Sequence, residues 1–292
     1  MSAESASASP RSRTVARASC ALLHALWNSL VKGSGDKFLS SALVALWSGV
    51  AAFASALVLP WPAPAAGPFI IASVLLHIVY FLLVGRLYRN ADLSVAYPIM
   101  RGAAPLMAAM IAFATLGERI APVAVLGVAA LVAGVLLMGA SGLAHRRLDV
   151  PALAAALVNS VVIAAYSVVD GEGARLSGSG SLHAFAYNAW ADALTAIAYA
   201  PIVFALRGPG TLAALARGWR RGIVGGFAAF VAYAIVVWAM TRAPIATVAA
   251  LRETSVVFAA VIGVALLGEP FRPQRAAASL IILAGVAALR LG

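Results

Sequence analysis

Two arginines stand inside long apolar runs of this 292-residue sequence and are its first candidates for chemistry. Arg101 lies in the run 92–116 and Arg252 in the run 244–267. If these runs cross a membrane, each charge costs about 2.5–3.5 kcal/mol on insertion scales, so such residues usually serve binding or transport. A guanidinium can hold a carboxylate, phosphate or phosphonate group through two parallel hydrogen bonds. We therefore expect both arginines to be substrate-binding residues.

Glu253 supplies the alternative interpretation. It follows Arg252 directly and offers that arginine an intramembrane ion pair, which would make the site structural. Gly102 stands at the equivalent position beside Arg101, so Arg101 has no acidic neighbour and substrate contact is favoured there. Glu253 itself is a candidate for substrate binding and for proton coupling.

Aromatic and imidazole side chains share helix faces close to these runs. Tyr97 lies four residues before Arg101, so the two share one face of a helix. Pro98 between them weakens the backbone hydrogen-bond ladder, as in the discontinuous helices of transporter sites. His77 and Tyr80 share a face of an earlier run. His77 could bind substrate or a coupling proton, or could simply bond a neighbouring helix.

Matching polar and aromatic faces occur in the first and sixth runs. Trp27 and Asn28 lie on one, and Asn159, Tyr166 and Asp170 lie on the other. Together these faces predict a cavity with aromatic walls and a few fixed polar groups, although Trp27 and Tyr166 could instead pack between helices. Asp170 is placed near a helix end, where a charge is inexpensive.

A further polar stripe follows helical spacing in the seventh run. It contains Asn188, Asp192, Thr195 and Tyr199. Asp192 falls in the middle of the run and is a candidate proton carrier, with an ion pair to an arginine elsewhere as the alternative.

The composition shows what must position these residues. Apolar residues make up 63% of the chain and charged residues only 11%, far from the roughly 25% charged residues of soluble domains. The chain is also too apolar to be disordered. Ten apolar stretches, each about long enough to span a bilayer, follow one another at about 16–32, 39–59, 69–89, 92–116, 121–140, 151–170, 183–206, 221–241, 244–267 and 273–291.

Several function classes find no support in the sequence. The net charge of +11 comes from scattered residues rather than a basic stripe, which argues against a nucleic-acid partner. One cysteine and four histidines give no metal-ligand pattern, and no ATP-binding motif is present. No catalytic triad or paired aspartates emerge. We expect a protein that is not an enzyme and needs no metal or cofactor.

An internal repeat organises the ten stretches. Arg101 and Arg252 are 151 positions apart, and the same offset relates Glu118 to Glu269 within two Leu-Gly-Glu segments. Because each copy contains five helices, the second copy must enter the membrane inverted, as in many secondary transporters. The sequence therefore predicts an all-α integral membrane protein of ten transmembrane helices, with a disordered tail at 1–15 and inverted five-helix repeats at 16–140 and 151–291. Glu118 and Glu269 fit helix-end anchors.

The chain resembles the EamA family of the drug/metabolite transporter superfamily. The resemblance rests on the two Leu-Gly-Glu segments at 116–118 and 267–269, on Leu-Leu-His-Ala-Leu-Trp-Asn at 22–28 and on Ala-Tyr-Pro-Ile at 96–99. It implies a ten-helix basket with a central cavity in the bacterial inner membrane. It also implies export of amino acids and other small metabolites.

We accordingly expect a secondary transporter that exports small polar or zwitterionic metabolites, such as amino acids, by alternating access. An organic-anion or phosphonate uptake carrier and a lipid-headgroup flippase are the alternatives. The partners would be a small-molecule substrate and the lipid bilayer, and the protein would be a monomer or homodimer. Orientation stays open, because twelve basic residues at one membrane face against seven at the other favour external termini, whereas the family resemblance implies cytoplasmic ones.

Overall fold

The computed structural model describes residues 37–90, 93–118, 121–143, 150–255, 257–258, 261 and 273–291. Within these ranges the chain is helical between short turns and contains no strand, which confirms the predicted all-α class. The first predicted helix, with Trp27 and Asn28, lies outside the described residues. The second Leu-Gly-Glu segment lies outside them as well.

The described helices follow the predicted apolar runs closely. Pro122 and Pro273 each begin a helix, where the fixed φ of proline suits the first turn. A 3-10 turn, η1, precedes α3. The elements are α2 (Lys37–Ala56), η1 (Pro64–Ala66), α3 (Gly67–Asn90), α4 (Leu93–Leu116), α5 (Pro122–Leu143), α6 (Val150–Leu176), α7 (Ser181–Arg207), α8 (Gly210–Arg217), α9 (Trp219–Met240), α10 (Ile245–Arg252) and α12 (Pro273–Leu291).

Six of the described helices are long and apolar enough to cross a membrane: α2, α3, α4, α6, α7 and α9. Large apolar side chains such as Leu75, Phe113 and Phe227 are exposed on their outer faces, at 59–61% of their full area. Lipid covers such apolar surface in a membrane, whereas soluble monomers rarely expose so large an apolar surface to water. The protein is therefore a multi-pass membrane protein.

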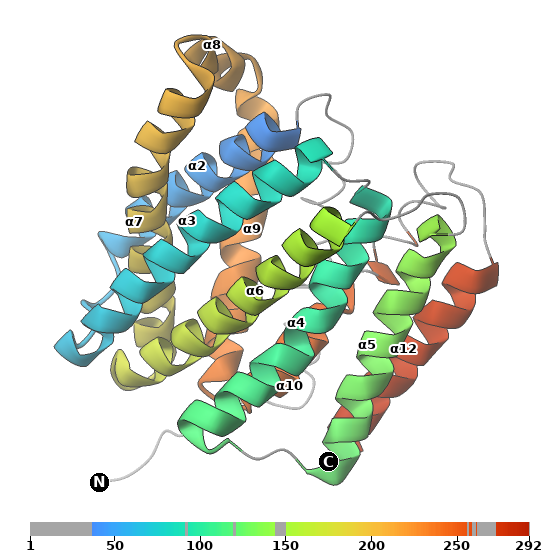
Figure 1. Ribbon diagram of the computed structural model, residues 1–292. Helices are drawn as coiled ribbons and strands as arrows, with labels where there is room; N and C mark the ends of the chain where they lie inside the picture. The colour runs from blue at the N-terminus through green and yellow to red at the C-terminus, as the bar shows by residue number, and fades with distance from the viewer. Residues whose placement is uncertain are drawn as a thin grey trace, which may run out of the picture.

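The bundle interleaves the two halves of the chain (Figure 1). α2 packs against α7 and α9, and α3 and α4 both pack against α6. α5 and α12 form an antiparallel pair at one side, joined to the rest mainly through α4. A Cβ atom added at Gly127 would lie 2.8 Å from the carbonyl oxygen of Gly285, so only glycine permits this approach of α5 to α12.

Three local features differ from the sequence prediction. α4 continues through Pro98, so the discontinuity expected there is absent. The interruption lies instead in the ninth run, where α10 ends at Arg252 and Glu253 and Thr254 form a turn. A short helix, α8, also fills the connection between α7 and α9, where no apolar run was predicted.

Candidate functional site

A cavity of about 120 Å³ opens among helices from both halves of the chain. An apolar cavity of about 150 Å³ can hold benzene, so this volume suits a small metabolite. The cavity brings together six of the predicted site residues: His77, Tyr80, Arg101, Tyr166, Asp192 and Arg252. Ser41, Ser48, Ser73, Asp170, Tyr187, Asn188, Thr195 and Tyr233 supply its other polar groups. The backbone of Tyr97 belongs to α4, but its side chain lies outside the described part of the structure.

Arg101 and Glu253 form a buried ion pair beside this cavity. The Nε of Arg101 donates to Oε2 of Glu253 across 2.8 Å, and only 4% and 1% of the two side chains are exposed. The sequence favoured Arg252 as the partner of Glu253, but the Nε of Arg252 lies 3.6 Å from Oε1 of that carboxylate. The carboxylate therefore bonds Arg101 most closely, because the turn after α10 directs it towards α4.

Arg252 is held in the cavity wall with unused hydrogen-bonding capacity. The residue is 5% exposed, and its Nε donates to no acceptor among the described residues. Its guanidinium carbon lies 5.8 Å from the centre of the Tyr166 ring. In the described part of the chain, the two guanidinium groups of Arg101 and Arg252 share the carboxylate of Glu253, which gives this part of the cavity wall a positive charge that can attract an anionic group.

Aromatic rings line the cavity around Tyr166. The His77 ring stacks on Tyr166 at a centroid distance of 4.3 Å, and Tyr80 and Tyr233 meet the same ring edge-on at 5.8 and 6.1 Å. Nδ1 of His77 lies 3.0 Å from the carbonyl oxygen of Ser73. A neutral imidazole that donates from Nδ1 to this carbonyl leaves Nε2 as an acceptor.

Two aspartates line the cavity as well. Asp170 is 1% exposed and accepts hydrogen bonds from the hydroxyls of Tyr187 at 3.1 Å and Tyr233 at 2.5 Å. The expectation that Asp170 lies close to a helix end was wrong, because α6 continues to Leu176. Asp192 accepts a hydrogen bond from the hydroxyl of Ser48, at 2.5 Å.

The sequence did not single out Ser48, Ser73, Tyr187 or Tyr233. Serines and tyrosines are common in membrane helices, and no charge or spacing marks these four. Their part in the site depends on which way α2, α3, α7 and α9 are turned, which only the packing of the bundle decides.

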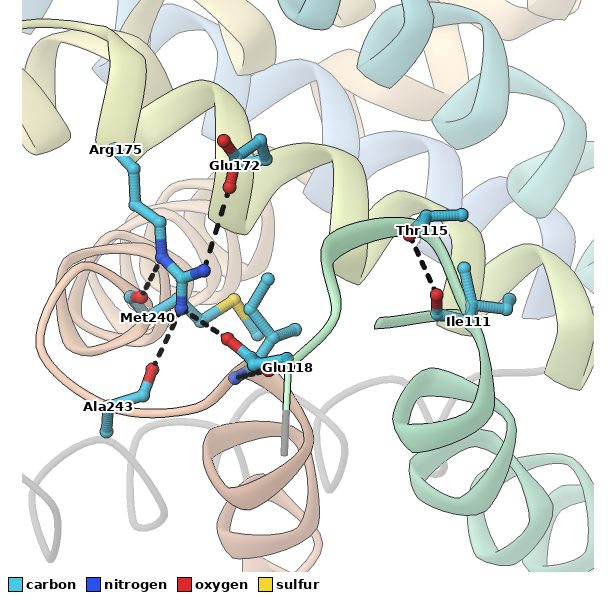
Figure 2. Close-up of polar contacts among 8 residues, drawn as sticks. Ile111, Thr115, Glu118, Glu172, Arg175, Met240 and Ala243 are labelled. Carbon is cyan, nitrogen blue, oxygen red and sulfur yellow. Dashed lines mark hydrogen bonds and ion pairs between the residues drawn. The ribbon is translucent and has the colours of Figure 1, made fainter. Parts of the chain in front are cut away.

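A second polar cluster lies at one end of the bundle (Figure 2). Arg175, near the end of α6, donates to Oε1 of Glu118 at 2.7 Å and to the carbonyl oxygens of Met240 and Ala243. Oε2 of Glu118 accepts the backbone N–H of Ile245, the first residue of α10, at 2.8 Å. Glu118 thus lies at a helix end, where it ties the ends of α4 and α6 to the start of α10.

In the part of the chain that the structure describes, no group of three or more His, Cys, Asp or Glu side chains is arranged to hold a metal ion. The fold and the site together define a helical, multi-pass membrane protein with a cavity lined by apolar, aromatic and polar side chains from both halves of the chain.

Comparison with known proteins points to one family. Residues 150–291, just under half of the chain, match the model of the EamA-like transporter family. A crystal structure of another protein matches 97% of this chain and 98% of its own, with a TM-score of 0.75 and 20% identity. At that identity the likeness shows a common fold along nearly the whole chain. No curated protein matches the sequence.

Proposed function

We propose that this protein is a secondary transporter of the drug/metabolite transporter superfamily that exports small polar or zwitterionic metabolites, amino acids in particular. The observation that carries the proposal is Arg252, a buried guanidinium in the cavity wall whose Nε has no hydrogen-bond acceptor among the described residues. Buried polar atoms nearly always have partners, so a bound anionic group would complete this site.

The charges of the cavity favour a zwitterion over a simple anion. Arg101 and Arg252 contribute positive charge beside Glu253, while Asp170 and Asp192 contribute negative charge from α6 and α7. A molecule with a carboxylate and an ammonium group could meet both kinds of charge at once. The two carboxylates would repel a phosphonate or other organic anion, which makes the uptake of such anions the weaker hypothesis.

The arrangement of the arginines supports alternating access around one central site. Arg101 and Arg252 occupy equivalent positions of the sequence repeat, and both line the same cavity. We propose that the repeats at 16–140 and 151–291 form inverted five-helix units in a bacterial inner membrane. Rocking of one unit against the other would then expose the cavity to each side in turn.

The test uses the purified full-length protein in liposomes loaded with a labelled pool of the twenty common amino acids. We expect the wild type to release a subset of the pool and Arg252→Ala to release it at least 10-fold more slowly, because a hydrogen bond to a charged group contributes about 1.5–3 kcal/mol. Arg220→Ala removes an exposed arginine at the start of α9 and serves as the control. Normal export by a folded Arg252→Ala protein would refute the site, and failure of the wild type to release any amino acid would refute the substrate class.

A further inference from the structure

We propose that Asp192 is a cation site that a proton and the ammonium group of the substrate occupy in turn, so that each exported molecule is exchanged for one proton. This inference rests on the proposed function and adds its coupling. It assigns the binding of the proton and of the ammonium group to one carboxylate of the cavity, that of Asp192.

The geometry of Asp192 leaves one carboxylate oxygen available to the cavity. Among the described residues, Ser48 alone donates a side-chain hydrogen bond to Asp192, and it does so at Oδ2. The side chain lines the cavity and is partly exposed there. Oδ1 can therefore bind a proton or accept a hydrogen bond from an ammonium group.

Asp170 differs in both respects. Tyr187 donates to its Oδ1 and Tyr233 to its Oδ2, and the residue is almost fully buried. These two hydroxyls satisfy the charged form of Asp170 and leave it little access to the cavity. Of the two aspartates, Asp192 is thus the one with room for a ligand.

Asn188 provides independent support for a ligand at this place. It lies one helical turn before Asp192 on α7, lines the same cavity and is 2% exposed. Its Nδ2 has no hydrogen-bond partner among the described residues. An amide buried in this way loses free energy unless a bound molecule or water completes it.

Charged and titratable groups from several elements line the same cavity as Asp192. His77 on α3 and Asp170 on α6 line the same cavity, as do Arg101 on α4, Arg252 on α10 and the hydroxyls of Tyr187 and Tyr233. With His77 neutral and Glu253 included, two positive and three negative charges are present when Asp192 is ionised. One added proton would balance this excess. A zwitterion adds no net charge, because its carboxylate lies with the arginines, so its ammonium group and the proton compete at Oδ1 of Asp192 itself.

The exchange follows from the two forms of the carboxylate. A protonated Asp192 carries no charge and holds an ammonium group poorly, so the substrate binds when the proton leaves towards the side from which the substrate comes. After the substrate departs on the other side, a proton from that side neutralises Asp192. No bond other than the O–H bond forms or breaks in the cycle.

The experiment uses the full chain in liposomes, the labelled pool of twenty amino acids and a pH-sensitive dye trapped inside. We expect a gradient of one pH unit to drive up to about 10-fold accumulation in the wild type, because one proton moves per substrate. Asp192→Asn should abolish both this accumulation and the dye signal. Glu172→Gln, which neutralises a carboxylate outside the cavity near the end of α6, should behave as the wild type.

Two further variants keep the result decisive if Asp192→Asn does not fold. Asp192→Glu retains a carboxylate and should retain coupling, whereas Ser48→Ala removes the hydrogen bond to Oδ2 and should shift the pH profile of exchange. Proton-driven accumulation by Asp192→Asn, or an unchanged pH profile in Ser48→Ala, would overturn the inference while leaving amino-acid export intact. Absence of any export by the wild type would instead overturn the proposed function, and the inference with it.

Discussion

Arg101 and Glu253 lie 152 positions apart in the sequence, yet the Nε of one and Oε2 of the other are 2.8 Å apart in the bundle. The pair joins α4 of the first half to the turn that follows α10 in the second. It also brings a carboxylate within 3.6 Å of Arg252. One acidic residue therefore fixes the charge balance of both arginines.

Loss of either partner of this ion pair should destabilise the protein, because the other partner is then left as an unpaired buried charge. Removing one member of a buried pair costs about 3–5 kcal/mol, whereas replacing both members costs far less. We expect Arg101→Met and Glu253→Gln each to lower the melting temperature in detergent on the order of 10 °C. The double variant should melt closer to the wild type, and additive losses would contradict a direct pairing.

The end cluster around Arg175 makes a smaller contribution, because its ion pair is partly open to solvent. The side chains of Arg175 and Glu118 are 29% and 14% exposed. After allowance for solvent screening, a double-mutant cycle of Arg175→Ala and Glu118→Ala should give a coupling energy of roughly 1 kcal/mol. Thermal unfolding of the four proteins measures it. A coupling near zero would mean that the contact does not persist in the membrane protein.

Close packing of α5 on α12 gives a prediction with a matched control. A methyl group at Gly127 would meet the carbonyl oxygen of Gly285 and the Leu289 side chain, both at 2.8 Å, whereas one at Gly67 would meet nothing within 4 Å. Gly127→Ala should destabilise the protein by about 1–3 kcal/mol, and Gly67→Ala should be neutral. Equal melting temperatures for the two variants would contradict this helix contact.

The distribution of arginines over the two ends of the bundle predicts its orientation. Among the side chains that the structure describes, five exposed arginines lie at the end that contains α8: Arg86, Arg207, Arg217, Arg220 and Arg221. At the opposite end, Arg175, Arg242 and the α12 residue Arg290 are accompanied by Glu118 and Glu172. Since basic residues favour the cytoplasmic side, we expect the α8 end to face the cytoplasm.

The C-terminal end of α12 lies at the other end, because Leu289 contacts Gly127 close to the start of α5. A C-terminal alkaline phosphatase fusion should therefore be active, and a C-terminal green fluorescent protein should stay dark. An insertion of each reporter between α7 and α8 should give the reverse pattern. Fluorescence from the C-terminal fusion would contradict this orientation.

Much of the helical framework could be predicted from the sequence, because the length and polarity of a membrane helix are local properties. α12 begins at Pro273 and ends at Leu291, as its apolar run indicated. The end of α10 at Arg252 could not be predicted in this way, since the run stays apolar on both sides of the turn. Polar atoms at such a turn are satisfied by neighbouring helices, which leave no mark in the local sequence.

Some residues of the candidate site could likewise be predicted from the sequence and others could not. Charged residues in apolar runs are so rare that the sequence singles out Arg101, Asp192 and Arg252, and all three line the cavity. Their partners could not be identified, since Ser48 and Tyr233 look like ordinary helix residues. Pairing depends on helix rotation, and rotation depends on contacts between distant parts of the chain.

α10 has eight residues and is therefore about 12 Å long. Its first N–H bonds Glu118 at the end of the bundle, and the residue after its last turn bonds Arg101 beside the cavity. Only about two helical turns separate these two contacts. An anion bound to Arg252 that shifted α10 would also shift the contact of Ile245 with Glu118 and that of Glu118 with Arg175. Occupancy of the cavity would then change the polar cluster at the end of the bundle.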